Sequence, residues 1–132
     1  MPITDRFIAG GVTTATSPVY RELIAGNSDL LVSRKGTLAA GQVLARGALL
    51  GRITASGKLV LSTAAATDGS QTPVAVLAHD TDASAADAET LFYERGDFNQ
   101  AAMTFGAGHT PDSVRAGLRT LGITLIKPYG AA

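Results

Sequence analysis

Three glycines divide an apolar internal stretch of this 132-residue chain and limit the secondary structure that it can form. They stand at positions 41, 47 and 51, among Val, Leu and Ala side chains within residues 41–54. A glycine inside a helix costs about 1 kcal/mol relative to alanine, so three of them argue against a helix here. Glycines suit the bends between short strands. The stretch therefore predicts a β-rich fold of short, bent strands.

Turn residues place the other expected strands. Residues 55–57 form a polar turn that ends in Gly57, and the apolar residues on either side of it predict a β-hairpin. Pro73 fits the start of a buried strand, because proline lacks the amide donor that an inner position needs. Strands are expected at residues 30–33, 53–54, 58–61, 73–78, 89–95 and 123–126, with turns at 35–36 and 67–70, a stop at Gly96 and an acidic loop at 80–88.

Two helices are expected in the C-terminal third. Asp97 and Gln100 have the spacing of a capping box and predict a short helix through Met103. The second helix has Thr110 as its N-cap and Pro111 at its first position. Its apolar stripe consists of Val114, Leu118 and Leu121, and Gly122 is a natural stop.

Composition excludes several classes of protein. The chain has no cysteine, which excludes disulfides, zinc–thiolate sites and cysteine nucleophiles. Eleven basic residues balance eleven acidic ones, and the densest basic spot is the pair Arg34–Lys35. Phosphate contacts need clustered positive charge, so we expect no nucleic acid partner. The chain also has no signal-peptide pattern at its start and no run near the roughly 18 apolar residues of a membrane span, so we expect no membrane partner.

Residues 1–28 differ from the rest and predict a flexible N-terminal arm, with residues 29–132 as the folded domain. Gly10–Gly11 and a Thr/Ser-rich run at 13–17 do not favour any regular backbone conformation. Large apolar side chains are nevertheless scattered through the arm, which is unusual for a purely solvated tail. Two alternatives stay open: a disordered terminus, or a segment that becomes ordered on a partner as an added strand.

The sequence offers little catalytic chemistry. His79 adjoins Asp80, but no Gly-x-Ser-x-Gly motif supplies an activated serine. The acidic run at 79–89 lacks the glycine and the final glutamate of a calcium loop. Gly106 and Gly108 precede a helix without a dinucleotide or Walker motif. We therefore expect no enzyme activity, no cofactor, no metal site and no small-molecule substrate.

The order of several segments resembles the bacteriophage head decoration proteins of the lambda decoration-protein type. The resemblance spans roughly residues 29–127, and none of its segments is a catalytic signature. The segments that carry it are residues 47–53 (GALLGRI), 68–78 (DGSQTPVAVLA), 91–99 (LFYERGDFN) and 118–122 (LRTLG), followed by Ile123.

The resemblance implies a fold and a function. Family members form a bent β-ribbon with a small incomplete barrel and a few short helices. They bind as homotrimers to the outside of the expanded head, at local three-fold sites, and hold the major capsid protein lattice against the pressure of packaged DNA. The protein is then made in the host cytoplasm and located on the outer capsid surface. An N-terminal arm becomes ordered on the shell, and its expected contact residues here are Phe7, Ile8, Val19, Tyr20, Leu23 and Ile24.

Two other function classes make different demands on the fold. A β-clip or barrel module that binds a carbohydrate or small ligand needs a compact pocket with aromatic platforms. Only Phe92, Tyr93, Phe98 and Phe105 could supply these platforms, and neighbouring strand residues 92 and 93 should face opposite sides. An enzyme would need a role for His79.

Overall fold

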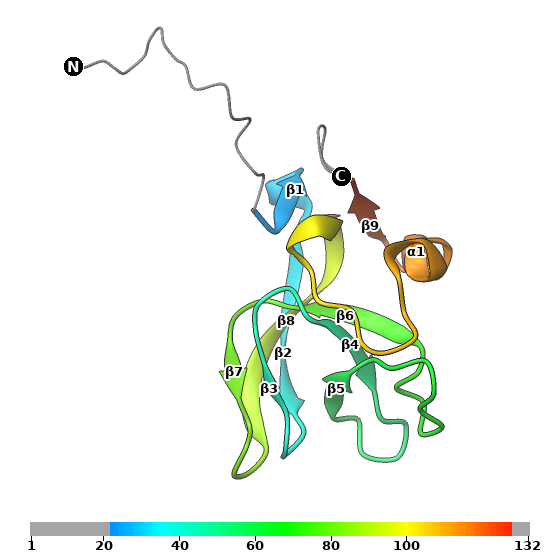
Figure 1. Cartoon of the computed structure of the whole chain (residues 1–132). Helices are drawn as coiled ribbons and strands as arrows, with labels where there is room; N and C mark the ends of the chain where they lie inside the picture. The colour runs from blue at the N-terminus through cyan, green and yellow to red at the C-terminus, as the bar shows by residue number, and fades with distance from the viewer. Residues whose placement is uncertain (1–21, 128–132) are drawn as a thin grey trace, which may run out of the picture.

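The computed structural model describes residues 22–127 and shows a mainly β chain with one short helix (Figure 1). Its strands are β1 (Ile24–Gly26), β2 (Val32–Leu38), β3 (Val43–Leu44), β4 (Leu49–Arg52), β5 (Leu59–Leu61), β6 (Pro73–Leu77), β7 (Thr81–Asp82), β8 (Ala88–Asn99) and β9 (Ile123–Ile126). The helix is α1 (Pro111–Thr120), and the two 3-10 turns are η1 (Ser28–Leu30) and η2 (Gln100–Ala102). The predicted fold class, mainly β with short helices, is confirmed at this level.

β8 is the longest strand, and the sheet is organised around it. From Ala88 to Arg95 it pairs antiparallel with β2, and its residues 92–93 also pair with β6 on the other edge. After Gly96 it exchanges these partners for β1, antiparallel on one side, and β9, parallel on the other. One strand thus connects the two ends of the molecule.

Five strands partly close the sheet on itself. β2 pairs with β8, β8 with β6, β6 with β4, β4 with β5, and β5 returns to β2. The last seam is short: one residue pair, Leu38 with Leu59, and a hydrogen bond of 2.9 Å from the Ala39 amide to the Leu59 carbonyl. This partly closed sheet agrees with the incomplete barrel that the resemblance implies.

The wall formed by β4, β6 and β8 has a hydrophobic core on each face. Successive strand residues point to opposite faces, so Leu49 enters one core and Leu50 the other. Phe92 and Tyr93 divide in the same way, as predicted. We call the first the α1 core (Leu23, Leu49, Val76, Phe98, Val114, Leu118, Ile123 and Leu125) and the second the barrel core (Leu38, Ala48, Leu50, Leu59, Ala75, Leu77, Ala83 and Phe92).

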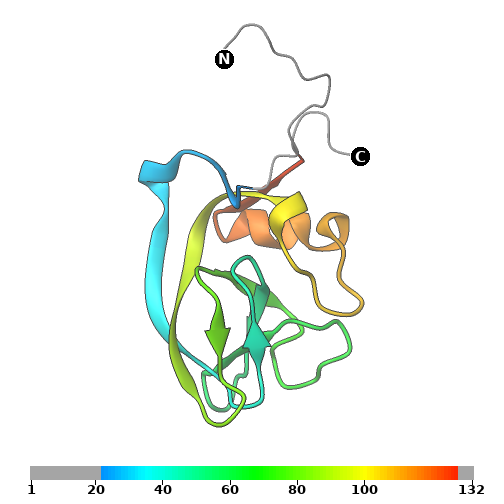
Figure 2. The same cartoon turned by 60° about the vertical axis from the view of Figure 1, so that its left-hand side comes forward.

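The α1 core is covered by the predicted helix, which lies across one end of the sheet (Figure 2). The Thr110 hydroxyl accepts from the Ser113 amide at 3.1 Å, and the Ser113 hydroxyl accepts from the Thr110 amide at 2.9 Å. Gly122 has φ +90° and ends the helix as predicted. The apolar stripe is confirmed at Val114 and Leu118, which are buried, and is wrong at Leu121, which is exposed.

Two predicted boundaries on β8 are wrong. Gly96 does not stop the strand: it lies inside β8 with φ +148°, and a Cβ there would come within 2.4 Å of Leu31. The short helix through Met103 does not start at Asp97. The Asn99 side chain caps the shorter turn η2 by accepting from the backbone amide of Ala101 at 3.0 Å. The Asp97 carboxylate instead accepts from the side-chain amide of Asn27 at 2.6 Å.

Three other glycine and loop predictions are corrected. Gly36 is not in a turn but inside β2, where a Cβ would lie 2.7 Å from the Phe92 ring. Gly51 is not at a bend but inside β4, where a Cβ would lie 2.0 Å from the Ser70 carbonyl oxygen. The acidic loop contains β7, which pairs with β3. In each case tertiary packing selects the residue, so local sequence rules do not identify it.

Candidate functional site: the root of the N-terminal arm

The residues predicted to contact a shell fall into two groups. Phe7, Ile8, Val19 and Tyr20 lie outside the described residues. Leu23 and Ile24 lie at the root of the arm, where the chain joins the domain. Leu23 is 2% exposed and belongs to the α1 core, and the half-buried Ile24 packs against the same core. Leu23 would have to leave this core before it could contact a shell.

Asn99 holds the arm root through its backbone amide and its side-chain amide. Its backbone amide donates to the Leu23 carbonyl at 2.7 Å, and its side-chain Nδ2 donates to the Glu22 carbonyl at 3.0 Å. Its Oδ1 accepts from the Ala101 amide at 3.0 Å. Asn99 is fully buried and Leu23 is 2% exposed, so the bond between these two residues is shielded from competing water. The two carbonyl groups at the arm root are thus fixed by one residue of β8.

The strand that follows the root is tied to the same part of β8. Within β1, Ile24 pairs with Phe98 and Gly26 with Asp97, with a register irregularity between them. Asn27 then turns the chain through the left-handed region, with φ +50°, while its side chain donates to Asp97. Asparagine is one of the few residues that adopt this conformation readily. Residues 22–27 are therefore seated on the domain, although the sequence places them within the predicted arm.

Sequence reasoning missed Asn99. Asp97 stands three residues before Gln100, and because this is the spacing of a capping box, Asp97 rather than Asn99 was predicted to cap the short helix. The signal that could have identified it is its own residue type, because asparagine is among the best N-cap residues. Its contacts with Glu22 and Leu23 join residues about 77 apart in sequence, and no local pattern predicts them.

Within residues 22–127, each outer edge of the sheet beside the arm root has a strand with only one partner. β1 stands at one end of the strand order, and β9 pairs with β8 alone in the described part of the chain. An open strand edge carries unpaired N–H and C=O groups and can accept an added strand. The arm therefore leaves the domain next to edges of this kind.

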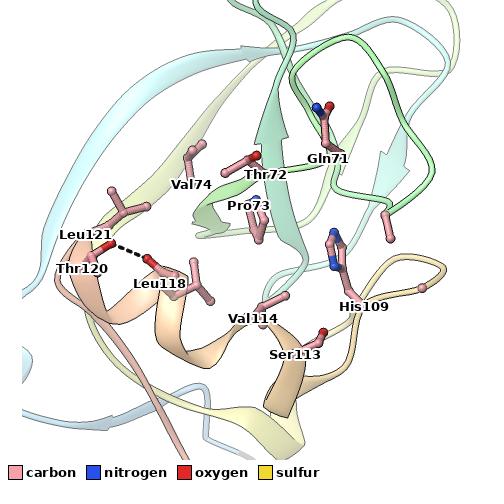
Figure 3. Close-up of a pocket in the computed structure, with 13 residues that line it drawn as sticks. Gln71, Thr72, Pro73, Val74, His109, Ser113, Val114, Leu118, Thr120 and Leu121 are labelled. Carbon is pink, nitrogen blue, oxygen red and sulfur yellow. Dashed lines mark hydrogen bonds between the residues drawn. The ribbon is translucent and has the colours of Figure 1, made fainter.

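A groove of about 570 Å³ lies on the other side of α1, between that helix and the start of β6 (Figure 3). Its lining mixes apolar and small polar residues: Ala64, Gln71, Thr72, Pro73, Val74, Gly108, His109, Ser113, Val114, Gly117, Leu118, Thr120 and Leu121. None of the four phenylalanine and tyrosine residues that could form aromatic platforms is among them. The groove therefore does not favour the carbohydrate-binding alternative.

His109 lines this groove and joins it to a buried network. Its Nε2 lies 3.1 Å from the Ser62 hydroxyl, which donates its only proton to the Ser70 carbonyl at 2.7 Å. His109 Nε2 must therefore be the donor to Ser62. Ser62 is fully buried, so its hydroxyl is not presented to a substrate. This arrangement fixes loops rather than activating a nucleophile.

The acidic side chains stabilise loops in the same way. Hydrogen bonds from the Ser70 hydroxyl and amide lower the pKa of Asp68, and bonds from Ser84 lower the pKa of Asp82. The Lys58 ammonium group, 2.6 Å away, lowers the pKa of Asp87. Within residues 22–127 we find no group of three or more His, Asp or Glu placed to hold a metal ion. No helix in that range is long and apolar enough to cross a membrane.

Comparison with known proteins gives the family. The family model of the bacteriophage lambda head decoration protein D matches residues 12–126, which include the arm root, both cores and α1. A search of curated proteins gives no match. The chain therefore belongs to the family of bacteriophage lambda head decoration protein D, a structural rather than a catalytic family that supports a role in decorating the phage capsid.

Proposed function

We propose that this protein binds as a trimer to the outside of the expanded phage head, at local three-fold sites. There it contacts the major capsid protein and stabilises the lattice against the pressure of packaged DNA. The observation that carries the proposal is the match of the head decoration family over residues 12–126. The match includes part of the predicted arm as well as the domain.

The exposed apolar side chains support self-association. Four large ones are exposed in the described part of the chain: Leu30, Val43, Leu91 and Leu121. They lie on η1, on β3, on β8 and after α1, so four separate segments of the chain present them. A closed ring of three copies uses two different faces of each subunit, and contacts of this kind would cover such residues. The balanced charge also suits a location outside the shell, away from DNA.

The division into an arm, residues 1–28, and a domain, residues 29–132, is part of the proposal. In it the arm becomes ordered as an added strand along the capsid protein, with Phe7, Ile8, Val19 and Tyr20 as contacts. Main-chain hydrogen bonds supply affinity in this mode, and alternate side chains supply specificity. Ile24 is half-buried at the root, and Leu23 reaches the shell only if it leaves the α1 core.

Co-sedimentation with heads that lack the protein tests the proposal. We expect saturable binding to expanded heads and no binding to unexpanded ones, because the proposed site belongs to the expanded lattice. A chain that starts at Glu22 keeps both described cores but lacks the proposed shell contacts, so it should lose most of its binding. Equal binding to both kinds of head would overturn the proposed site, and equal binding by the shortened chain would overturn the role of the arm.

A further inference from the structure

We propose that Asn99 and Leu23 form a latch that fixes the root of the arm and thereby positions the arm for shell binding. The inference rests on the proposed function and adds a positioning residue to it. The arm-root latch consists of Asn99 with the Glu22 and Leu23 carbonyls, together with the Leu23 side chain. These residues hold the arm but need not touch the shell.

The chemistry of the latch requires asparagine. Nδ2 donates to the Glu22 carbonyl while Oδ1 accepts from the Ala101 amide, so the side chain needs one donor end and one acceptor end. Aspartate would place a second acceptor against the Glu22 carbonyl. Alanine would remove the partner of both that carbonyl and the Ala101 amide.

The Leu23 side chain fixes the same segment from the opposite direction. It is 2% exposed within the α1 core, whose members come from β4, β6, β8, α1 and β9. Gly47 lies beside it: a Cβ at that position would be 3.4 Å from Leu23 Cδ1, an ordinary van der Waals contact. The chain therefore cannot slide along β8 at this point without emptying a core position.

A fixed root has two consequences for an arm that binds a shell. The arm starts from one place and one direction, so less conformational freedom is lost when it becomes ordered on a partner. Tension on the bound arm also passes directly into β8, which is held by four other strands. Both effects strengthen binding of the arm to the capsid lattice without any additional contact between the two.

The matched pair Asn99→Ala and Ser62→Ala in the full-length chain tests the latch. Ser62 is also fully buried and hydrogen-bonded, but its network lies at the groove and does not reach the arm root. Both variants should lower the thermal midpoint. Well below those midpoints, we expect Asn99→Ala to weaken binding to expanded heads by roughly tenfold, because the arm then loses more conformational freedom on binding. Ser62→Ala should leave binding unchanged.

A double-mutant cycle separates positioning from general destabilisation. Replacing Phe7 and Tyr20 with alanine removes proposed shell contacts, so the loss caused by Asn99→Ala should be smaller in that background. Fully additive losses, or unchanged binding by Asn99→Ala, would overturn the positioning role.

Hydrogen exchange tests the latch without any head. In Asn99→Ala, the amides of residues 23–26 should exchange faster, while those of α1 keep their rates; in Ser62→Ala, residues 23–26 should be unaffected. Unchanged exchange at the root would refute the latch even if the wild-type protein binds heads. Faster exchange at the root, with no head binding by the wild-type protein, would instead overturn the proposed function and leave the latch intact.

Discussion

Several positions of this protein require glycine because a backbone oxygen lies where a Cβ atom would be. At Gly51 a Cβ would lie 2.0 Å from the Ser70 carbonyl oxygen, and at Gly106 it would lie 1.9 Å from the Ser62 carbonyl oxygen. Real Cβ atoms do not approach a backbone oxygen so closely. At Gly117 of α1, by contrast, a Cβ would meet nothing within 4 Å.

These surroundings predict opposite effects for two identical substitutions. Gly51→Ala should lower the free energy of unfolding by about 1–3 kcal/mol, because the β4 backbone must move away from Ser70. Gly117→Ala should raise it by roughly 0.5–1 kcal/mol, because alanine favours the helix and has free space. Urea denaturation of both variants measures the difference. Equal effects of the same sign would show that the close approach at Gly51 does not constrain β4.

Asp68 predicts how stability depends on pH. Its Oδ1 accepts from the Ser70 amide at 3.0 Å and from the Ser70 hydroxyl at 2.5 Å, which lowers its pKa below the usual 3.8. The folded state therefore binds this proton less tightly than the unfolded state. The stabilisation is present above the unfolded pKa and is lost as the pH falls through the folded pKa.

The variant Asp68→Asn removes that titration. Its thermal midpoint should be lower than that of the wild type near neutral pH. The difference should start to shrink as the pH falls through the unfolded pKa and should vanish below the folded pKa. Thermal unfolding followed by circular dichroism between pH 2 and 7 gives both curves. Asp82 and Asp87 keep their lowered pKa values, so some acid sensitivity remains in the variant. A constant difference between the curves would contradict the assignment.

At the scale of elements, α1 has a sequence that specifies it locally. Thr110, Pro111 and Ser113 define its start, and Thr110 and Ser113 exchange hydrogen bonds as a capping box. The helix then covers the α1 core and leads into β9, which pairs parallel with β8. The order of the helix and this strand was predictable because caps and periodicity act within a few residues.

Thr110→Ala should therefore destabilise the protein through the helix start. Losing an N-cap hydroxyl costs about 1 kcal/mol, since an amide of the first turn loses its partner. Thr110→Ser keeps the hydroxyl and is the matched control, with stability close to that of the wild type. Chemical denaturation measures both variants. If alanine and serine are equivalent at this position, the cap does not stabilise the helix.

β8 shows why other elements were not predictable. Its central residues favour a strand, but its length depends on Gly96 passing beside Leu31. Its end depends on Asn99, whose partners Glu22 and Leu23 come from the start of the described chain. β7 was missed because two residues carry too little pattern to distinguish a strand from a loop. Contacts between distant segments determine all three features.

At the scale of the whole molecule, one wall of strands supports two cores. The apolar runs of β4 and β6 contribute to both faces, which explains why they are continuous rather than alternating. The sequence predicted the run of β6 as a buried strand and placed that of β4 only among short, bent strands, and the order of segments indicated the family. The pairing of β2 with β5, which closes the sheet, could not be predicted from the sequence, because it consists of one residue pair.

The candidate site was also only partly predictable from the sequence. The composition of residues 1–28 left open a disordered terminus or a segment that becomes ordered on a partner; the resemblance implied shell binding, and that role stays a prediction. The seating of Leu23 in the α1 core emerged only from the structure, since a leucine near an end of the chain gives no sign of its partners. The arm root is where the domain and the proposed shell-binding segment meet.

Electron cryo-microscopy of expanded heads, before and after addition of the full-length protein, tests the central claim most directly. We predict added density on the outer surface at the local three-fold positions, with each site fitted by three copies of residues 22–127. Density should continue from Glu22 along the major capsid protein, as an ordered arm requires. Heads without added density, or with density on the inner surface or away from the three-fold positions, would contradict the account.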